Sequence, residues 1–343
     1  MTVQKLFETD LDLLSESWHA SLRSRNLARS TITNYLASVR MLDEFLTAKG
    51  MPRSVANIKR EHIEMFLADI LETRTPSTAN SRYVALKQFW MWLLEEGEVA
   101  QSPLRNIKQV KVGVPIIPTL SLEEIKTLLN VCKRDKSFLG MRDHALLRLY
   151  ATTGARRSEI VNLALDQDAY YLRRKQLSQS LNSHAPNVEM PSGYIDFDHK
   201  QVVIIANKSN RPRVTNVDPD TMLAIRRYIR ARSNHRRFDL PWLWLSNSGR
   251  KRYRESGRLT AGGVNQILDR RAEQAGLRHI SPHVFRHSWV HHSLAKGLGE
   301  GNVAEIAGWS PSSAAAMLAR YGAVHRRERA LDADREFGIG GDL

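Results

Sequence analysis

The chain of 343 residues contains a single cysteine, Cys132. An internal disulfide is therefore excluded, which fits a reducing compartment. No apolar run approaches the roughly 18 residues that a membrane-spanning helix needs. The first twenty residues carry acidic side chains through their middle and lack a cleavage-like end, so we expect no secretory signal. These absences predict a cytoplasmic protein that does not span a membrane.

Acidic residues are scarce relative to basic ones: 36 Asp and Glu stand against 51 Lys and Arg, a net charge of +15. Residues 1–119 hold 15 basic and 13 acidic residues (+2), which leaves 36 and 23 (+13) for residues 120–343. Such a surplus favours a polyanionic partner, either nucleic acid or an anionic membrane surface, although basic residues can also form an ordinary solvated surface.

Residues 1–105 carry the pattern of a small helical bundle. Apolar side chains recur at helical spacing in Thr31–Leu46, Ile63–Leu71 and Tyr83–Leu94, and an earlier helix is expected over Leu11–Leu22. Four such helices can enclose one core. We expect the aromatic residues of this part to lie in that core, and not to serve as stacking platforms for bases.

A domain boundary follows the bundle. Residues 106–119 (NIKQVKVGVPIIPT) contain two prolines and a glycine and have no helical period, so they predict an extended linker. Ser121 and Glu124 then form an S-x-x-E capping box ahead of an apolar run. A second domain, residues 120–343, is predicted to begin there.

The second domain mixes helices with a short sheet. β-Branched runs at Gln201–Ala206 and Arg213–Val217 predict a β-hairpin, and Asp218-Pro219 starts a helix. The polar, irregular residues 168–193 are predicted to be a loop insertion. Further helices are expected at Met141–Thr153, Arg157–Leu165, Thr260–Ala275, Pro282–Lys296, Ser310–Arg320 and Arg326–Glu336.

Two segments carry arginines suited to phosphate binding. In TGARRSE (residues 153–159) a glycine ends one helix and Arg156 opens the next, where its guanidinium can reach a phosphate beside outward-facing N–H groups. Glu159 can hold that guanidinium, although an Arg–Glu pair at this spacing is usually an ordinary helix-surface pair. In HVFR, His283 and Arg286 share a helix face; the histidine can move protons and the arginine can bind phosphate with two hydrogen bonds.

A lysine and a tyrosine complete the set. Lys208 lies in the predicted hairpin turn, where it could enter a DNA groove and protonate a leaving oxygen, or be no more than an exposed turn charge. It suits that role better than Lys200, which precedes the first strand. Tyr321 follows a predicted helix, and its phenol can attack a phosphodiester and conserve the bond energy as a phosphotyrosine.

Other chemistries fit this sequence poorly. His283, His287 and His291 have a spacing that could bind zinc, but the glutamate of an H-E-x-x-H site is missing and no cluster of cysteines or acids accompanies them. The glycines of residues 297–301 resemble a nucleotide-binding loop, but no strand precedes them, so they indicate a helix end and a loop. We expect neither a metal nor a cofactor.

The ordered series TGARRSE, lysine-bearing hairpin, HVFR, AGW (residues 307–309) and RYG (residues 320–322) resembles the catalytic series of the tyrosine recombinases, the phage integrase family. Each piece is common alone, but five in this order are hard to obtain by chance. The resemblance implies a mostly α fold with a small antiparallel sheet: an N-terminal four-helix SAM-like core-binding domain, and an α+β catalytic domain ending in a helix for protomer contacts.

The resemblance also implies roles for the arginines and the histidine. Arg156 and Arg286 would clamp the scissile phosphate and neutralise charge as the pentacoordinate transition state forms. Glu159 would support the clamp. His283 would accept or donate a proton.

For the remaining positions, the resemblance implies that Lys208 is the general acid toward the 5′-hydroxyl leaving group. Trp309 would donate a hydrogen bond or pack against the site. Tyr321 would attack and leave a 3′-phosphotyrosyl link. The 12 residues from Trp309 to Tyr321 exceed the usual family spacing.

A member of this family is expected to act on double-stranded DNA with inverted-repeat core sites, with two protomers on each duplex and four in a complex that exchanges strands. It would be a monomer or weak dimer when free, nucleoid-associated in the cell, and in some systems dependent on a second recombinase or a DNA-bending protein. A mobile element is one source of such enzymes. The alternatives are a type IB topoisomerase-like enzyme, which the separate N-terminal helical unit disfavours, and a non-catalytic DNA-binding protein, which a broken catalytic set would favour.

Overall fold

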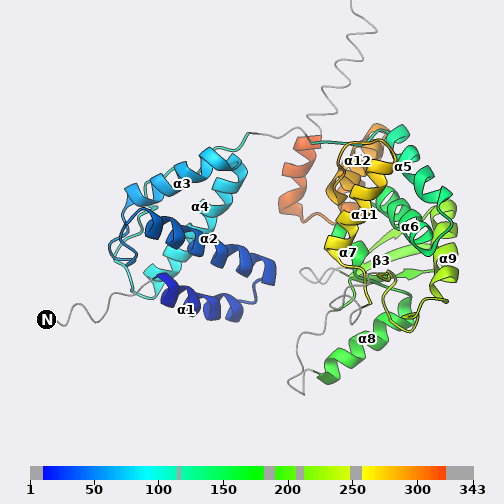
Figure 1. Ribbon diagram of the computed structural model, residues 1–343, viewed down its shortest axis with the longest axis horizontal. Helices are drawn as coiled ribbons and strands as arrows, with labels where there is room; N and C mark the ends of the chain where they lie inside the picture. Colours follow the sequence, from blue (N-terminus) through cyan, green and yellow to red (C-terminus); the bar gives the residue numbers. More distant parts are fainter. Residues whose placement is uncertain (1–10, 114–116, 181–189, 206–211, 248–256, 322–343) are drawn as a thin grey trace, which may run out of the picture. The chain divides into compact units, whose positions relative to one another are not determined.

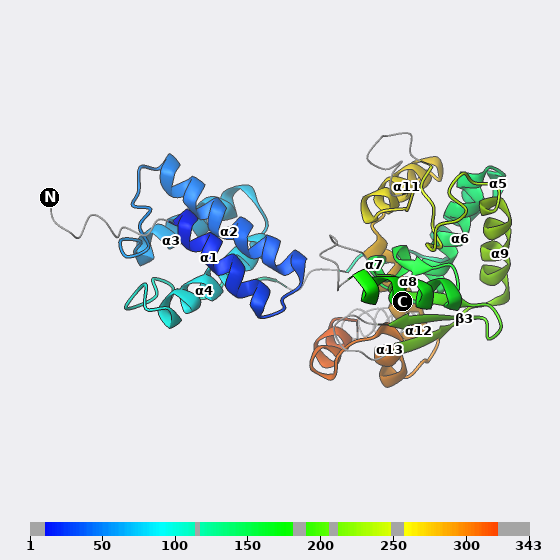
Figure 2. The same ribbon diagram turned by 90° about the horizontal axis from the view of Figure 1, so that it is seen from below.

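The computed structural model describes residues 11–113, 117–180, 190–205, 212–247 and 257–321. The chain divides into two compact units, Met1–Val114 and Pro115–Leu343 (Figures 1 and 2). Within the described ranges, no helix has both the length and the apolar character that crossing a membrane requires.

The first unit is a bundle of four helices, as predicted. They are α1 (Leu11–Ser24), α2 (Arg29–Ala48), α3 (Arg60–Thr73) and α4 (Pro76–Glu95). The last helix begins with Pro76 at its first position, and the Thr75 side chain caps it by accepting from the Thr78 N–H. Trp18 and Phe89 are fully buried with ring centroids 5.0 Å apart. The expectation that the aromatic residues form the core is confirmed.

The second unit is largely helical. Its helices are α5 (Leu122–Arg134), α6 (Phe138–Thr153), α7 (Arg157–Val161), α8 (Gln167–Ser180), α9 (Pro219–Arg232), α11 (Ala261–Gln274), α12 (Pro282–Ala295) and α13 (Glu300–Ala307), followed by helical residues 311–321. The capping box before α5 forms as predicted, because Ser121 and Glu124 each accept the other's backbone N–H. The helix expected at Arg326–Glu336 lies outside the described residues.

A four-stranded sheet, in the order β1-β2-β3-β4, lies among these helices. Its strands are β1 (Leu163–Ala164), β2 (Gly193–Asp196), β3 (Gln201–Ile205) and β4 (Pro212–Asn216). The predicted hairpin is confirmed, since β3 and β4 pair antiparallel with Val203 opposite Val214. The fold class, mostly α with a small sheet, is also confirmed. The sheet is mixed, however, because β1 pairs parallel to β2.

Two segments differ from the prediction. Residues 167–180, expected to be part of a loop, form α8, which begins where the Asp166 carboxylate accepts from the Ala169 N–H. This helix has no apolar stripe in sequence because it buries little more than Tyr170, which packs on Tyr194 of β2. The helix expected over Arg157–Leu165 ends at Val161, and its last residues form β1 because they pair with β2.

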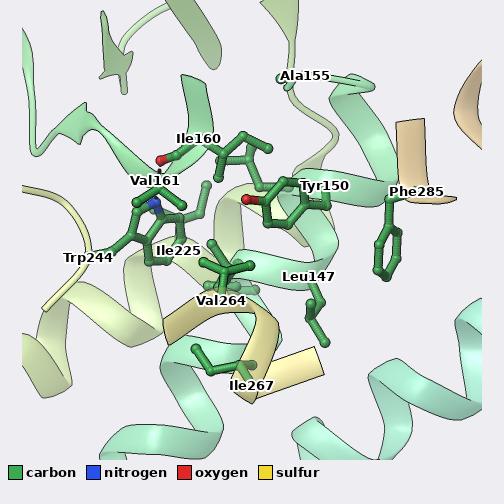
Figure 3. Close-up of a cluster of buried hydrophobic side chains, with 14 of the residues drawn as sticks. Leu147, Tyr150, Ala155, Ile160, Val161, Ile225, Trp244, Val264, Ile267 and Phe285 are labelled. Carbon is green, nitrogen blue, oxygen red and sulfur yellow. Dashed lines mark hydrogen bonds between the residues drawn. The ribbon is translucent and has the colours of Figure 1, made fainter. Parts of the chain in front are cut away.

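The main core of the second unit includes residues of α7, which follows Arg156, and of α12, which carries Arg286. Figure 3 shows Tyr150 between Ile160, on α7, and Phe285, on α12. The Tyr150 and Phe285 rings lie 6.0 Å apart, and Trp244 Nε1 donates to the Ile160 carbonyl at 2.8 Å. All four residues are fully buried. This packing fixes the backbones of α7 and α12, and so the starting points of Arg156 and Arg286.

Candidate active site

Arg156 sits in a tight connection between α6 and α7. Gly154 ends α6 in the left-handed region (φ +57°), and an added Cβ there would come within 2.4 Å of the Trp289 ring. Glu159 accepts from the Arg156 backbone N–H at 2.6 Å and from Arg156 Nη1 at 2.9 Å. The guanidinium is thus held along one edge, while the side chain remains 41% exposed. It can still bind an anion on its free side.

Glu159 is itself held by a second arginine. Arg213 of β4 donates from Nη1 and Nη2 to the two carboxylate oxygens, at 3.0 and 2.5 Å. Burial of Glu159 would raise the pKa of its carboxyl, but hydrogen bonds from Arg213 and Arg156 outweigh burial and lower it. Glu159 therefore stays ionised, and one carboxylate serves two guanidiniums.

Arg286 lies on α12 and is 5% exposed. Its Nη1 donates to the Gly154 carbonyl at 2.8 Å and its Nη2 to the Ala307 carbonyl at 2.7 Å. Burial and the nearby charges of Arg156 and Arg213 lower the pKa of Arg286 to about 10, so it remains protonated at neutral pH. Because both acceptors are uncharged, they leave its positive charge available to a phosphate.

The turn that ends α13 binds both Arg156 and Arg286. Gly308 caps α13 in the left-handed region (φ +63°), and its carbonyl accepts from Arg156 Nη2 at 3.0 Å. The preceding carbonyl, of Ala307, is the acceptor for Arg286. Trp309 follows, with its ring centroid 5.7 Å from the Arg286 guanidinium carbon. Two successive carbonyls and an indole therefore bring Arg156 and Arg286 to one place.

Tyr321 lies beside Trp309. The two rings stack with centroids 5.9 Å apart, and Tyr321 is only 3% exposed. Its hydroxyl is hydrogen-bonded to Nδ1 of His287 on α12. Burial raises the pKa of Tyr321 to about 12, although the charges of Arg286 and Arg320 oppose this. The tyrosine is therefore protonated and enclosed in this structure.

His283 precedes Arg286 by one turn of α12 and is exposed. Desolvation, followed by the charges of Arg157 and Arg286, lowers the pKa of His283, so its neutral form predominates at neutral pH. Its ring lies 6.5 Å from that of His287. Of the predicted site residues, the structure thus brings together Arg156, Glu159, His283, Arg286, Trp309 and Tyr321.

Lys208 lies outside the described residues. The flanking strands β3 and β4 are described, and Lys200 stands at the opposite end of β3 from the hairpin turn, exposed and in the left-handed region (φ +56°). Lys200 therefore does not approach the arginines through that turn. Within the described ranges, no cluster of three or more His, Cys, Asp or Glu residues could hold a metal ion.

Sequence analysis missed two residues of this site. Arg213 occupies an inward position of β4 while the apolar Val214 beside it is exposed, so the alternation in the sequence does not indicate a buried arginine. His287 stands out in the sequence only through its zinc-like spacing from His283 and His291. Its contact with Tyr321 depends on how residues 311–321 fold back onto α12, and no local pattern encodes that.

Comparison with known families gives two matches. The family description "Phage integrase, N-terminal SAM-like domain" matches residues 14–97, and "Phage integrase family" matches residues 187–326. The chain belongs to the phage integrase family of tyrosine recombinases. It is an enzyme of site-specific DNA recombination.

Individual relatives align with most of the length of this chain. Tyrosine recombinase XerD of Rickettsia bellii (strain RML369-C) is 23% identical over 328 residues, which cover 94% of this chain and 98% of the relative. The fold is similar to that of XerH site-specific recombinase bound to palindromic difH substrate in a post-cleavage complex (TM-score 0.66, 17% identity, 90% and 81% coverage). It is also similar to a lambda integrase tetramer bound to a Holliday junction (TM-score 0.59, 13% identity, 92% and 80% coverage).

Two half-buried histidines, His144 and His287, predict how the stability of this recombinase depends on pH. Burial is the largest cause that lowers the pKa of both His144 and His287 from 6.5 to about 4. The unfolded chain therefore takes up protons at pH values where the folded chain does not. We expect the free energy of unfolding to fall as the pH decreases from 6.5 toward 4.

Urea denaturation at about pH 7 and about pH 5 measures this dependence. His144→Gln, which lies outside the active site, should reduce the loss of stability between the two pH values. An unchanged loss in that variant would show that His144 does not contribute.

Proposed function

We propose that this recombinase cuts and rejoins DNA through a 3′-phosphotyrosine formed at Tyr321. The observation that carries the proposal is the α13 turn, where successive carbonyls hold Arg286 and Arg156 beside Trp309 and Tyr321. Two guanidiniums fixed next to a phenol suit a phosphodiester, whose negative charge must be neutralised as a nucleophile approaches.

In the proposed step, the Tyr321 oxygen attacks phosphorus while the bond to the 5′-oxygen breaks. His283, neutral at physiological pH, accepts the phenol proton, and Lys208 protonates the departing 5′-oxygen. The role of Lys208 rests on its place in the motif series alone. Rejoining is the reverse reaction, with the 5′-hydroxyl of another strand attacking the phosphotyrosine. Since no bond is hydrolysed, the scheme needs neither a metal nor a cofactor.

Tyr321 must leave its pocket before it can react. In the pocket it is 3% exposed and bonded to His287, and burial disfavours the phenolate. Next to a phosphate held by Arg156 and Arg286, the two positive charges would favour the phenolate instead. The described conformation is therefore a resting state, and cleavage begins with a movement of residues 311–321.

In the proposed assembly, each part of the chain has its own role. Residues 1–105 would clamp DNA, residues 106–119 would link the domains, and residues 120–343 would carry the chemistry, with Arg326–Glu336 contacting a neighbouring protomer. Four protomers would join two duplexes at inverted-repeat sites. The similarity of the fold to a lambda integrase tetramer bound to a Holliday junction supports this arrangement.

Covalent trapping tests the proposal. The protein is incubated with a pool of nicked duplexes drawn from its host's DNA, because a nick near the cleavage site lets the 5′-hydroxyl fragment diffuse away and stops rejoining. The mixture is denatured, and the DNA that remains attached is sequenced. We expect adducts whose sequences share an inverted repeat.

The other outcomes point to different enzymes. Adducts without a shared sequence would favour the topoisomerase-like reaction. DNA binding without adducts, even when the pool contains the inverted repeat found by footprinting, would favour a non-catalytic binder and contradict the proposal.

A further inference from the structure

Arg213 is a buried arginine that the proposed chemistry does not use. It occupies an inward position on β4, and its side chain is 8% exposed. Both ends of its guanidinium are bound to Glu159. Its surroundings, however, contain both groups that hold Arg156.

The first of these groups is Glu159. Arg213 donates from Nη1 and Nη2 to the two carboxylate oxygens of Glu159, at 3.0 and 2.5 Å. The same carboxylate accepts from the backbone and the side chain of Arg156. A carboxylate on a single bond to its chain could rotate, but one bound on both oxygens by a planar guanidinium has a fixed plane. Arg213 therefore sets the orientation of the Glu159 carboxylate that Arg156 meets.

The second group is the turn at Gly308. A Cβ at Gly308 would come within 2.2 Å of Arg213 Nη1 and 3.0 Å of its Cζ, so the guanidinium lies against the turn backbone. The carbonyl of Gly308 is the other acceptor for Arg156, and the preceding carbonyl binds Arg286. One side chain on the sheet thus contacts both supports of Arg156.

We propose that Arg213 is a positioning residue for strand cleavage, which fixes Glu159 and the Gly308 turn so that Arg156 meets the scissile phosphate in the correct geometry. It does not contact DNA. A buried Arg–carboxylate pair is weak evidence for a stabilising role, because apolar residues of similar size often replace such pairs without loss of stability. The inference rests on the proposed function, since it assigns Arg156 to the phosphate.

The test compares Arg213→Met with Arg271→Met. Arg271 is a matched control, because its side chain is 4% exposed and binds the carboxylates of Asp143 and Asp135. Among the described residues, none of its hydrogen bonds or ion pairs involves Arg156, Glu159 or the Gly308 turn. Single-turnover cleavage of a nicked duplex is measured below the melting temperature of each variant. We expect Arg213→Met to cleave about 10- to 100-fold more slowly with unchanged DNA affinity, and Arg271→Met to cleave at the wild-type rate. Arg213→Lys should recover part of the loss.

A neutral substrate separates positioning from a general structural defect. Replacing the scissile phosphate with a methylphosphonate removes the negative charge that Arg156 neutralises. We expect the penalties of Arg213→Met and of Arg156→Met both to shrink on this substrate. An equal penalty on both substrates would overturn the proposal, because a distorted fold would slow both alike.

The combination with Glu159→Gln gives a second readout. If Arg213 acts through Glu159, the double variant should be little slower than the slower single variant; fully additive penalties would contradict the proposal. Failure of the proposed function is distinguishable, since the wild-type protein would then form no adduct at Tyr321. If the wild-type protein forms the adduct and Arg213→Met cleaves equally fast, only the role of Arg213 is refuted.

Discussion

Tyr321→Phe should abolish the covalent protein–DNA adduct while leaving the fold and DNA binding intact. The substitution removes the attacking oxygen, so we expect cleavage to fall by at least about a thousandfold. The phenylalanine ring can keep its stacking on Trp309, and only the hydrogen bond to His287 is lost. The free energy of unfolding should therefore change by no more than about 1 kcal/mol. Denaturing gels measure the adduct, and urea titrations measure the stability.

Tyr83→Phe is the matched control. Tyr83 is 5% exposed, and its hydroxyl donates to the Ile107 carbonyl at 2.9 Å within the N-terminal bundle. Its loss should cost about 1 kcal/mol of stability and leave the adduct at the wild-type level. An adduct that persists in Tyr321→Phe would move the nucleophile to another residue, and mass spectrometry of the trapped peptide would identify it.

Gly308→Ala should cause the second large loss of activity. A side chain at φ +63° is strained, and the new Cβ would lie 2.2 Å from Arg213 Nη1, so the turn or Arg213 must shift. Either shift moves the carbonyls that hold Arg156 and Arg286. We expect single-turnover cleavage to fall by about a hundredfold, because a misplacement of about 1 Å can cost that much.

Gly276→Ala separates the strain from the contact. Gly276 has nearly the same φ, +67°, but an added Cβ there meets nothing within 4 Å. The left-handed backbone should cost both variants about 1 kcal/mol of stability, and the contact with Arg213 should add to the loss in Gly308→Ala alone. Only Gly308→Ala should lose cleavage activity. Wild-type cleavage by Gly308→Ala would show that the turn does not set the positions of the arginines.

Elements encoded by local chemistry could be predicted from the sequence. Ser121 and Glu124 cap α5 through short-range hydrogen bonds, and Asp218 with Pro219 starts α9 in the same way. The bundle helices carry their apolar residues at helical spacing, so burial and period agree. The order of motifs along the chain likewise indicated which arginines, histidine and tyrosine to expect in one site.

What the sequence did not reveal depends on contacts between distant segments. Helix α8 has almost no apolar face, and β1 is strand only because β2 lies beside it. The carbonyls that bind Arg156 and Arg286 belong to residues 307 and 308 and carry no side-chain signal. The enclosure of Tyr321 by His287 and Trp309 likewise arises from packing between elements.

The enclosure of Tyr321 bears on how the protein can safely search a genome. A chain with a net charge of +15 will spend most of its time on sequences other than its target, since attraction to the phosphate backbone does not depend on sequence. If Tyr321, the nucleophile we propose, were exposed during that search, every encounter could leave a broken strand. With the phenol enclosed, an encounter with an unrelated sequence ends with the duplex intact, and the risk of damage is confined to complexes that draw Tyr321 out.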